Sequence, residues 1–146
     1  MYDTILMPVD GSDVSSHALD EGLKLASALG SGVILMYVVD MTIATMPEAE
    51  LGMSNIEVMR KSFVEQGEKV VRVAGEAAAA KGVRFETVIA EGDVQDEILG
   101  MAEEKKVELI IIGTHGRRGL NRLLLGSVAE SVSKRAHCPV LLIRPA

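Results

Sequence analysis

The stretch LIIIGTHG at residues 109–116 decides the fold class. Four consecutive aliphatic residues lead into a glycine turn, without the alternation that is typical of a strand with one solvated face. Such a strand fits a parallel sheet that helices cover on both faces. Most of the other apolar runs share this character, and the five predicted strands are Thr4–Val9, Gly32–Val39, Val83–Ala90, Val107–Ile112 and Val140–Ile143.

Helical patterns fill the gaps between these strands. The predicted helix limits are Ser12 or Asp13 to Gly30, a capping box at Ser54–Glu57 to Gly82, a start near Asp93, and Ser127–Ala136. The resulting β-α-β-α-β-α-β-α-β order predicts one doubly wound α/β domain over residues 1–146. Residues 40–53 lack strong periodicity, and we expect a variable connection there.

Composition excludes several classes of function. The chain has 146 residues, a formal net charge of −6 and a single cysteine, Cys138. A nucleic-acid partner is not expected, because proteins of that class usually carry a basic patch. No apolar run is long enough to span a membrane and no secretory signal is evident, so we expect a cytoplasmic protein. One cysteine excludes an internal disulfide and a cysteine-cluster metal site.

Gly113, Gly116 and, nine residues later, Gly126-Ser127 indicate a phosphate site. Glycines let backbone N–H groups approach an anion closely, and a helix beginning at Ser127 would direct its positive end toward it. Each residue also has a structural explanation. Gly113 and Gly116 fit an ordinary turn after a strand, and Ser127 with Glu130 fits a capping box without a ligand.

Four residues at the predicted strand ends, or in the loop after one of them, are further candidates for a ligand site. Arg117 suits a polyphosphate because a guanidinium donates paired hydrogen bonds, although a solvated loop is the preferred explanation for any single arginine here. His115 could contact phosphate or be incidental. Asp10 could accept hydrogen bonds from a ribose hydroxyl or an exocyclic amine, or cap the helix that follows. Val39 could present backbone groups to a base edge, or belong to the core.

Several other site classes lack their motifs. The sequence contains no Walker A motif, no G-x-G-x-x-G after the first predicted strand and no G-x-S-x-G. The three histidines form no metal-spaced pair. A P-loop NTPase, a dinucleotide Rossmann site, a serine hydrolase and a zinc enzyme are therefore not favoured.

The spacing from Gly113 through Gly116 to Gly126-Ser127 resembles the nucleotide-binding signature of the universal stress protein family. The resemblance extends to the flanking segments ILMPVDGS (5–12), LLGSVAE (124–130) and CPVLLI (138–143). It covers essentially the whole chain. Each piece alone is weak, and the combination is specific.

This resemblance implies a five-stranded parallel sheet in the order 3-2-1-4-5 and a homodimer that pairs Val140–Ile143 with its copy. Because every signature position is present, it also implies the ATP-binding branch of the family, with Mg²⁺ accompanying ATP. The implied contacts are Asp10 and Val39 for adenosine, Gly113 and Gly116 for ribose and the first phosphates, and Gly126, Ser127 and Val128 for the phosphate chain; Pro8, His115 and Arg117 complete the predicted nucleotide site.

The leading functional hypothesis is an ATP-binding regulatory protein that senses nucleotide state in the stress response. No general base is paired with a nucleophile in the sequence pattern, so no catalytic residue is predicted. One alternative is a slow Mg²⁺-dependent ATPase or AMP-transferring enzyme that uses Asp10. Another is a dimeric interaction module with a vestigial site, or one that takes AMP or cyclic AMP.

Overall fold

The computed structural model describes residues 1–42, 53–115 and 125–146. The expected variable connection lies largely in the first gap, outside the described residues. The elements in chain order are β1 (Thr4–Pro8), α1 (Asp13–Leu29), β2 (Gly32–Asp40), α3 (Met53–Ala80), β3 (Phe85–Gly92), α4 (Val94–Glu104), β4 (Leu109–Gly113), α5 (Ser127–Arg135) and β5 (Val140–Ile143).

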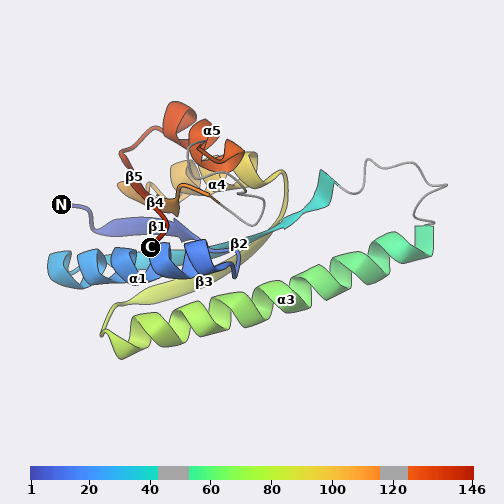
Figure 1. Cartoon of the computed structure of the whole chain (residues 1–146), viewed down its shortest axis with the longest axis horizontal. Coiled ribbons are helices and arrows are strands. Elements are labelled where there is room, and N and C mark those ends of the chain that lie inside the picture. Colours follow the sequence, from blue (N-terminus) through green and yellow to red (C-terminus); the bar gives the residue numbers. More distant parts are fainter. Residues whose placement is uncertain (43–52, 116–124) are drawn as a thin grey trace.

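The five strands form one parallel sheet in the order β3-β2-β1-β4-β5 (Figure 1). This confirms the expected fold class and strand order. Strand β1 occupies the centre, and Leu6 pairs with both Ile34 of β2 and Ile110 of β4. The chain therefore adds strands first on one side of β1 and then on the other.

Two strands begin later than the sequence predicts. Val83 and Val107 were expected to start strands, but β3 begins at Phe85 and β4 at Leu109. The Val83 amide donates to the Ala78 carbonyl at 3.0 Å, and the Val107 amide donates to the Ala102 carbonyl at 2.9 Å. Both valines are buried, yet their backbone closes the end of the preceding helix. Apolar character alone did not distinguish these two roles.

Alternate residues of each strand feed two separate cores. Leu109 and Ile111 pack with α1 and α3, whereas Ile110 and Ile112 pack with α4 and α5. Figure 1 shows these two pairs of helices on opposite sides of the sheet. Burial on both faces explains why the strands read as continuous apolar runs.

Helix termini fall at the predicted residues in three places. Ser12 caps α1 and accepts a hydrogen bond from the Ser15 amide, while Gly30 ends that helix in the left-handed conformation with φ 72°. Asp93 caps α4 through the Asp96 amide. The predicted cap at Ser54 is wrong, because α3 already includes Met53 and Ser54 lies inside the helix.

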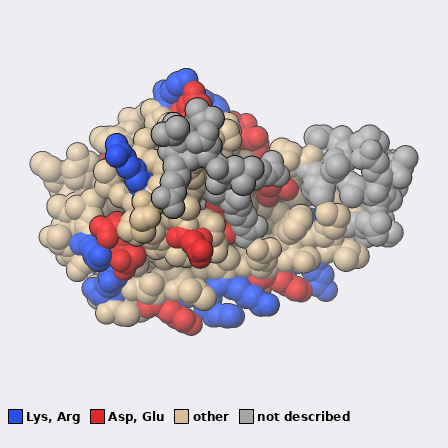
Figure 2. All heavy atoms as spheres, in the orientation of Figure 1, with Lys and Arg blue, Asp and Glu red and all other residues tan. Residues whose placement is uncertain are grey.

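The surface mixes charges of both signs. Figure 2 shows acidic and basic side chains interspersed along α3 and near α5 on the face that it displays. Several form exposed ion pairs within one helix, such as Lys24 with Asp20 and Glu21. Within the described residues, no helix combines the length and apolar character needed to cross a membrane.

We predict opposite effects for two glycine-to-alanine substitutions. A Cβ at Gly67 would lie 2.5 Å from the ring of the buried Tyr37, whereas one at Gly100 of α4 would meet nothing within 4 Å. Overpacking costs about 1–3 kcal/mol, and alanine gains about 1 kcal/mol over glycine in a helix. Gly67→Ala should lower the free energy of unfolding in urea, by up to about 2 kcal/mol, and Gly100→Ala should raise it. Equal effects would contradict the close packing of α3 on β2.

Candidate functional site

The carboxyl ends of β1 and β4 lie next to each other at the centre of the sheet. From β1 the chain crosses to β2 on one side, and β4 leads to β5 on the other. In open α/β sheets, ligands bind in the crevice at such a reversal of strand order. Among the predicted site residues, Pro8 ends β1 and Asp10 follows it, and Gly113 ends β4 and His115 follows it. The fold therefore brings these two groups to one edge.

The loop after β1 is fixed by three hydrogen bonds. The Asp10 carboxylate accepts from the Ser12 amide at 2.8 Å, and the Asp10 amide donates to Ser15 Oγ at 3.1 Å. The Ser15 amide in turn donates to Ser12 Oγ at 3.1 Å. Gly11 lies between them with φ 82°, which favours glycine. Asp10 thus shapes the turn, while Ser12 caps the helix, and Ser15 emerges as a positioning residue that the sequence did not indicate.

Pro8 and Val39 occupy different environments at this edge. Pro8 is the half-buried last residue of β1, and the following amide, that of Val9, donates to the Met36 carbonyl at 2.8 Å. Val39 lies near the end of β2 and is only 1% exposed, packed in the core on the α1 and α3 side. Of the two roles considered for Val39 from the sequence, its side chain therefore has the one in the core.

Gly113 is needed for packing at the end of β4. A Cβ there would lie 3.2 Å from Val14 Cγ1 and 3.7 Å from Ala18 Cβ. The glycine lets the first turns of α1 approach β4 closely. This gives Gly113 a structural role in addition to any contact with a ligand.

Thr114 joins three elements through its backbone. Its amide donates to the carbonyl of Ile143, the last residue of β5, at 2.9 Å, and its carbonyl accepts from the Gly126 amide at 2.8 Å. The end of β4 is thereby tied to β5 and to the start of α5. The sequence did not identify Thr114, because a role carried by backbone atoms leaves no side-chain signature.

His115 is buried beside this junction. The residue is 7% exposed, and its Nδ1 lies 2.8 Å from Thr114 Oγ1. Nε2 is buried without a hydrogen-bond partner among the described residues. Buried polar atoms are nearly always paired, so this nitrogen is an exception among the described residues.

The start of α5 differs from the predicted capping box. Gly126, with φ −62° and ψ 149°, is the N-cap residue, and Ser127 is the exposed first helical residue. Glu130 does not reach back to the helix start, because its carboxylate pairs with Lys134 Nζ at 2.8 Å. The hydrogen bond from Lys134 lowers the pKa of Glu130. Ser127 as a cap is therefore wrong, and the true N-cap residue has no side chain that could accept from the first-turn amides.

This arrangement suits an anion. The first amides of an α-helix lack intrahelical acceptors and carry the positive end of the helix dipole. Here they belong to Ser127 and to Val128, whose side chain packs on the α4 and α5 core. Within the described residues, no group of three or more histidine, cysteine or acidic residues is placed to hold a metal. Two predicted site residues, Gly116 and Arg117, lie outside the described residues.

Comparison with known proteins identifies relatives over nearly the full chain. Residues 1–144 match the family described as "Universal stress protein family". A universal stress protein of Methanocaldococcus jannaschii is 39% identical over 144 residues, which cover 99% of this chain and 83% of that protein.

Solved structures show the same fold. The universal stress protein UspA from Lactobacillus plantarum superposes with a TM-score of 0.88 at 25% identity and 98% coverage of both chains. A universal stress protein solved in complex with cAMP has a TM-score of 0.72 at 25% identity, covering 99% of this chain and 98% of that one.

We predict that Ser15 stabilises the Asp10 loop through its hydroxyl. Ser15→Ala removes the acceptor of the Asp10 amide in a buried setting, which should lower the free energy of unfolding by about 1–2 kcal/mol. Ser16→Ala, at the exposed neighbouring position, is the matched control and should change stability by less than about 0.5 kcal/mol. Urea unfolding of both variants tests this, and a loss of equal size in the two would contradict it.

Proposed function

The chain belongs to the universal stress protein family, and we propose that the edge formed by the carboxyl ends of β1 and β4 binds ATP as part of a regulatory, nucleotide-sensing role in the stress response. Adenine nucleotide binding is seen among structural neighbours, one of which is the complex with cAMP. ATP is favoured for this chain because the loop between β4 and α5 carries the full glycine signature and several arginines.

The observation that carries this proposal is the anchored start of α5. The bond between the Gly126 amide and the Thr114 carbonyl holds the helix start beside the end of β4. A glycine N-cap leaves room for a ligand oxygen where a serine or aspartate side chain would otherwise compete. Helix N-termini of this kind bind phosphate.

The remaining predicted residues divide between the two ends of the nucleotide. Asp10 and the backbone near Val39 would hold adenosine, with Pro8 beside them at the end of β1. Gly113, Gly116, His115 and Arg117 would hold the ribose and first phosphates. Gly126, Ser127 and Val128 would hold the phosphate chain. Mg²⁺ would be bound mainly by phosphate oxygens and water, as this ion commonly is.

Binding is the proposed activity, with hydrolysis slow or absent. The Asp10 carboxylate already accepts a hydrogen bond from Ser12, and a general base must be able to reach the proton that it removes. His115 Nδ1 does lie 2.8 Å from Thr114 Oγ1, but both residues are buried, each only 7% exposed, so we assign this pair to the packing at the end of β4. We also propose a cytoplasmic location for this role.

We further propose a homodimer through β5. This strand ends the sheet, and its residues are only partly buried, with Leu141 37% exposed. Apolar edge strands are normally covered or paired. Antiparallel pairing of Val140–Ile143 with the same strand of a second copy would cover this edge and continue the sheet.

We predict that Ser127→Asp abolishes tight ATP binding without unfolding the chain. The added carboxylate would repel phosphate, whereas a negative charge in the first helical turn is itself favourable by about 0.3–1 kcal/mol. Calorimetric titration with Mg²⁺–ATP should show at least tenfold weaker binding. Ser127→Asn has nearly the same shape without the charge and should lose much less.

Two outcomes would contradict the proposal. If the wild type and Ser127→Asp bound ATP with equal affinity, the phosphates could not lie at the start of α5. Multiple ATP turnover that disappears in Asp10→Ala would favour the enzymatic alternative. Mass spectrometry of small molecules released by heat from the purified chain identifies the nucleotide and distinguishes ATP from AMP and cyclic AMP.

We predict that Leu141→Lys converts the proposed dimer to a monomer. Two lysines would then meet at the paired edge, where like charges directly opposite each other are destabilising. Light scattering after size-exclusion chromatography measures the change. Val73→Lys, on the exposed side of α3, is the control and should remain dimeric. A wild-type monomer, or an unchanged mass for Leu141→Lys, would exclude this interface.

A further inference from the structure

Strand β3 forms the other end of the sheet, away from the candidate nucleotide site. Its eight residues, FETVIAEG, contain no proline and no lysine, and their pairing with β2 runs without interruption from Phe85 to Gly92. Prolines, lysines and bulges are the usual devices that keep an edge strand from pairing. This edge therefore lacks three common protections.

The backbone direction along β3 follows from one hydrogen bond. The Val33 amide of β2 donates to the Arg84 carbonyl at 2.9 Å. In a parallel pair, successive residues direct their backbone groups alternately toward and away from the neighbouring strand. Phe85, Thr87 and Ile89 therefore present their N–H and C=O groups to the open edge.

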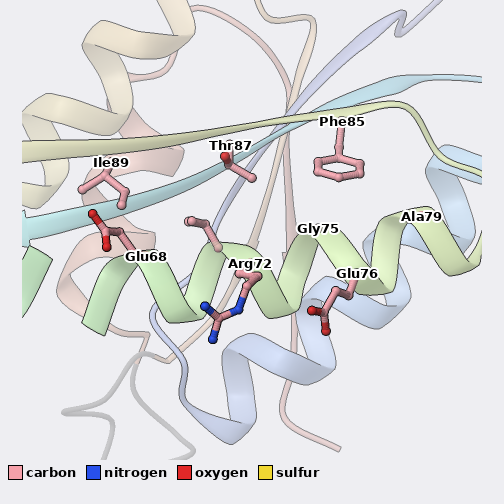
Figure 3. Close-up of a pocket in the computed structure, with 9 residues that line it drawn as sticks. Glu68, Arg72, Gly75, Glu76, Ala79, Phe85, Thr87 and Ile89 are labelled. Atoms are coloured by element: carbon pink, nitrogen blue, oxygen red, sulfur yellow. The ribbon is translucent and has the colours of Figure 1, made fainter. Parts of the chain in front are cut away.

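The side chains of these same three residues line a groove against α3 (Figure 3). The groove has a volume of about 630 Å³, and Val71, Gly75 and Ala79 of α3 form its other wall. Phe85 remains 43% exposed within it. The same three residues of β3 thus provide both the outward N–H and C=O groups and one wall of an apolar groove.

Gly75 determines the shape of the groove. A Cβ at this position would lie 2.7 Å from Cε2 of Phe85, so the glycine allows the ring to lie flat against the helix. One side of the ring packs on α3 and the other contributes to the groove. Figure 3 shows Phe85, Thr87 and Ile89 in a row along the strand, facing the helix.

The rim of the groove carries an unbalanced charge. Glu68, Arg72 and Glu76 follow one another at one-turn intervals on α3 and line the groove. None of the three has an opposite charge within 4.0 Å among the described residues, whereas Arg60 on the same helix pairs with Glu57 and Glu91. Two acidic groups and one basic group give the rim a net charge of −1.

We propose that the β3 edge binds an extended, basic segment of a partner protein, which adds to the sheet as a strand. Main-chain bonds to Phe85, Thr87 and Ile89 would supply affinity, and alternate aliphatic side chains would enter the groove, as in other cases of strand addition. Lysine or arginine in the segment would complement Glu68 and Glu76. A second copy of the chain is disfavoured because it would bring an identical, net negative rim against this one.

The probe for this proposal is a library of random seven-residue peptides displayed on phage. Selection on the wild-type chain should enrich alternating aliphatic residues with interspersed lysine or arginine. A fluorescein-labelled peptide made from the enriched sequence should bind at least tenfold more weakly to Thr87→Pro in an anisotropy titration. Proline removes only the outward N–H there, and edge strands tolerate it at such positions; circular dichroism verifies the fold.

Charge reversal provides the second, independent arm of the test. Glu68→Lys combined with Glu76→Lys should also weaken the peptide at least tenfold. The matched control is Glu103→Lys combined with Glu104→Lys, which makes the same change in net charge at exposed positions of α4 and should leave binding within about twofold. This arm remains informative if Thr87→Pro does not fold.

Amide hydrogen exchange locates the bound segment. In the free chain the amides of Phe85, Thr87 and Ile89 should exchange faster than that of Val88, and the peptide should slow these three selectively. The proposal is overturned if no enriched peptide binds the wild type more tightly than it binds Thr87→Pro and the variant that combines Glu68→Lys with Glu76→Lys. Protection of the three amides in the free chain that grows with protein concentration would overturn it in favour of pairing between copies.

Discussion

The position of β1 at the centre of a sheet that must be covered on both faces constrains the whole molecule. Because β1 pairs with β2 on one side and β4 on the other, the strand order has to reverse there. In open α/β sheets, ligands bind outside the carboxyl ends of the strands at such a reversal. The sequence places its short polar and glycine-rich segments at these two strand ends, so the candidate site is a product of the topology and of local turn chemistry together.

Close packing of helices on the sheet depends on glycine at several separate points. A Cβ at Gly22 would lie 2.6 Å from Met7 Sδ, and a Cβ at Gly67 or Gly75 would lie similarly close to Tyr37 or Phe85. At Gly113 the approach to Val14 is less tight, at 3.2 Å. These glycines bring α1 and α3 near the strands while leaving large side chains beside them. At Gly113 the result is a compact junction next to the candidate site, and at Gly75 it is a groove. One packing device therefore produces different surfaces at different places.

Sequence patterns predicted elements better than their ends. The continuous aliphatic run before Gly113 indicated a strand buried on both faces. Ser12, one of two residues offered as the cap of the first helix, is the N-cap residue, and a helix does start next to Asp93 as predicted. Ser54 and Ser127 satisfied the same capping pattern but lie inside their helices, because a serine spaced from a glutamate cannot by itself report where helical backbone begins. Thr114 and the groove beside Phe85 were not predicted, since both depend on atoms brought together by tertiary structure.

The two hydrogen bonds at Thr114 have a mechanical consequence. A single residue joins the start of α5 to the last residue of β5, so a displacement of the helix end that moved Thr114 would also move the sheet edge. Events at these two places would then share a coupling free energy, and such coupling is reciprocal. A ligand that strengthens pairing of β5 between two copies would itself bind more tightly to the dimer. The ligand affinity of this chain would then depend on the protein concentration.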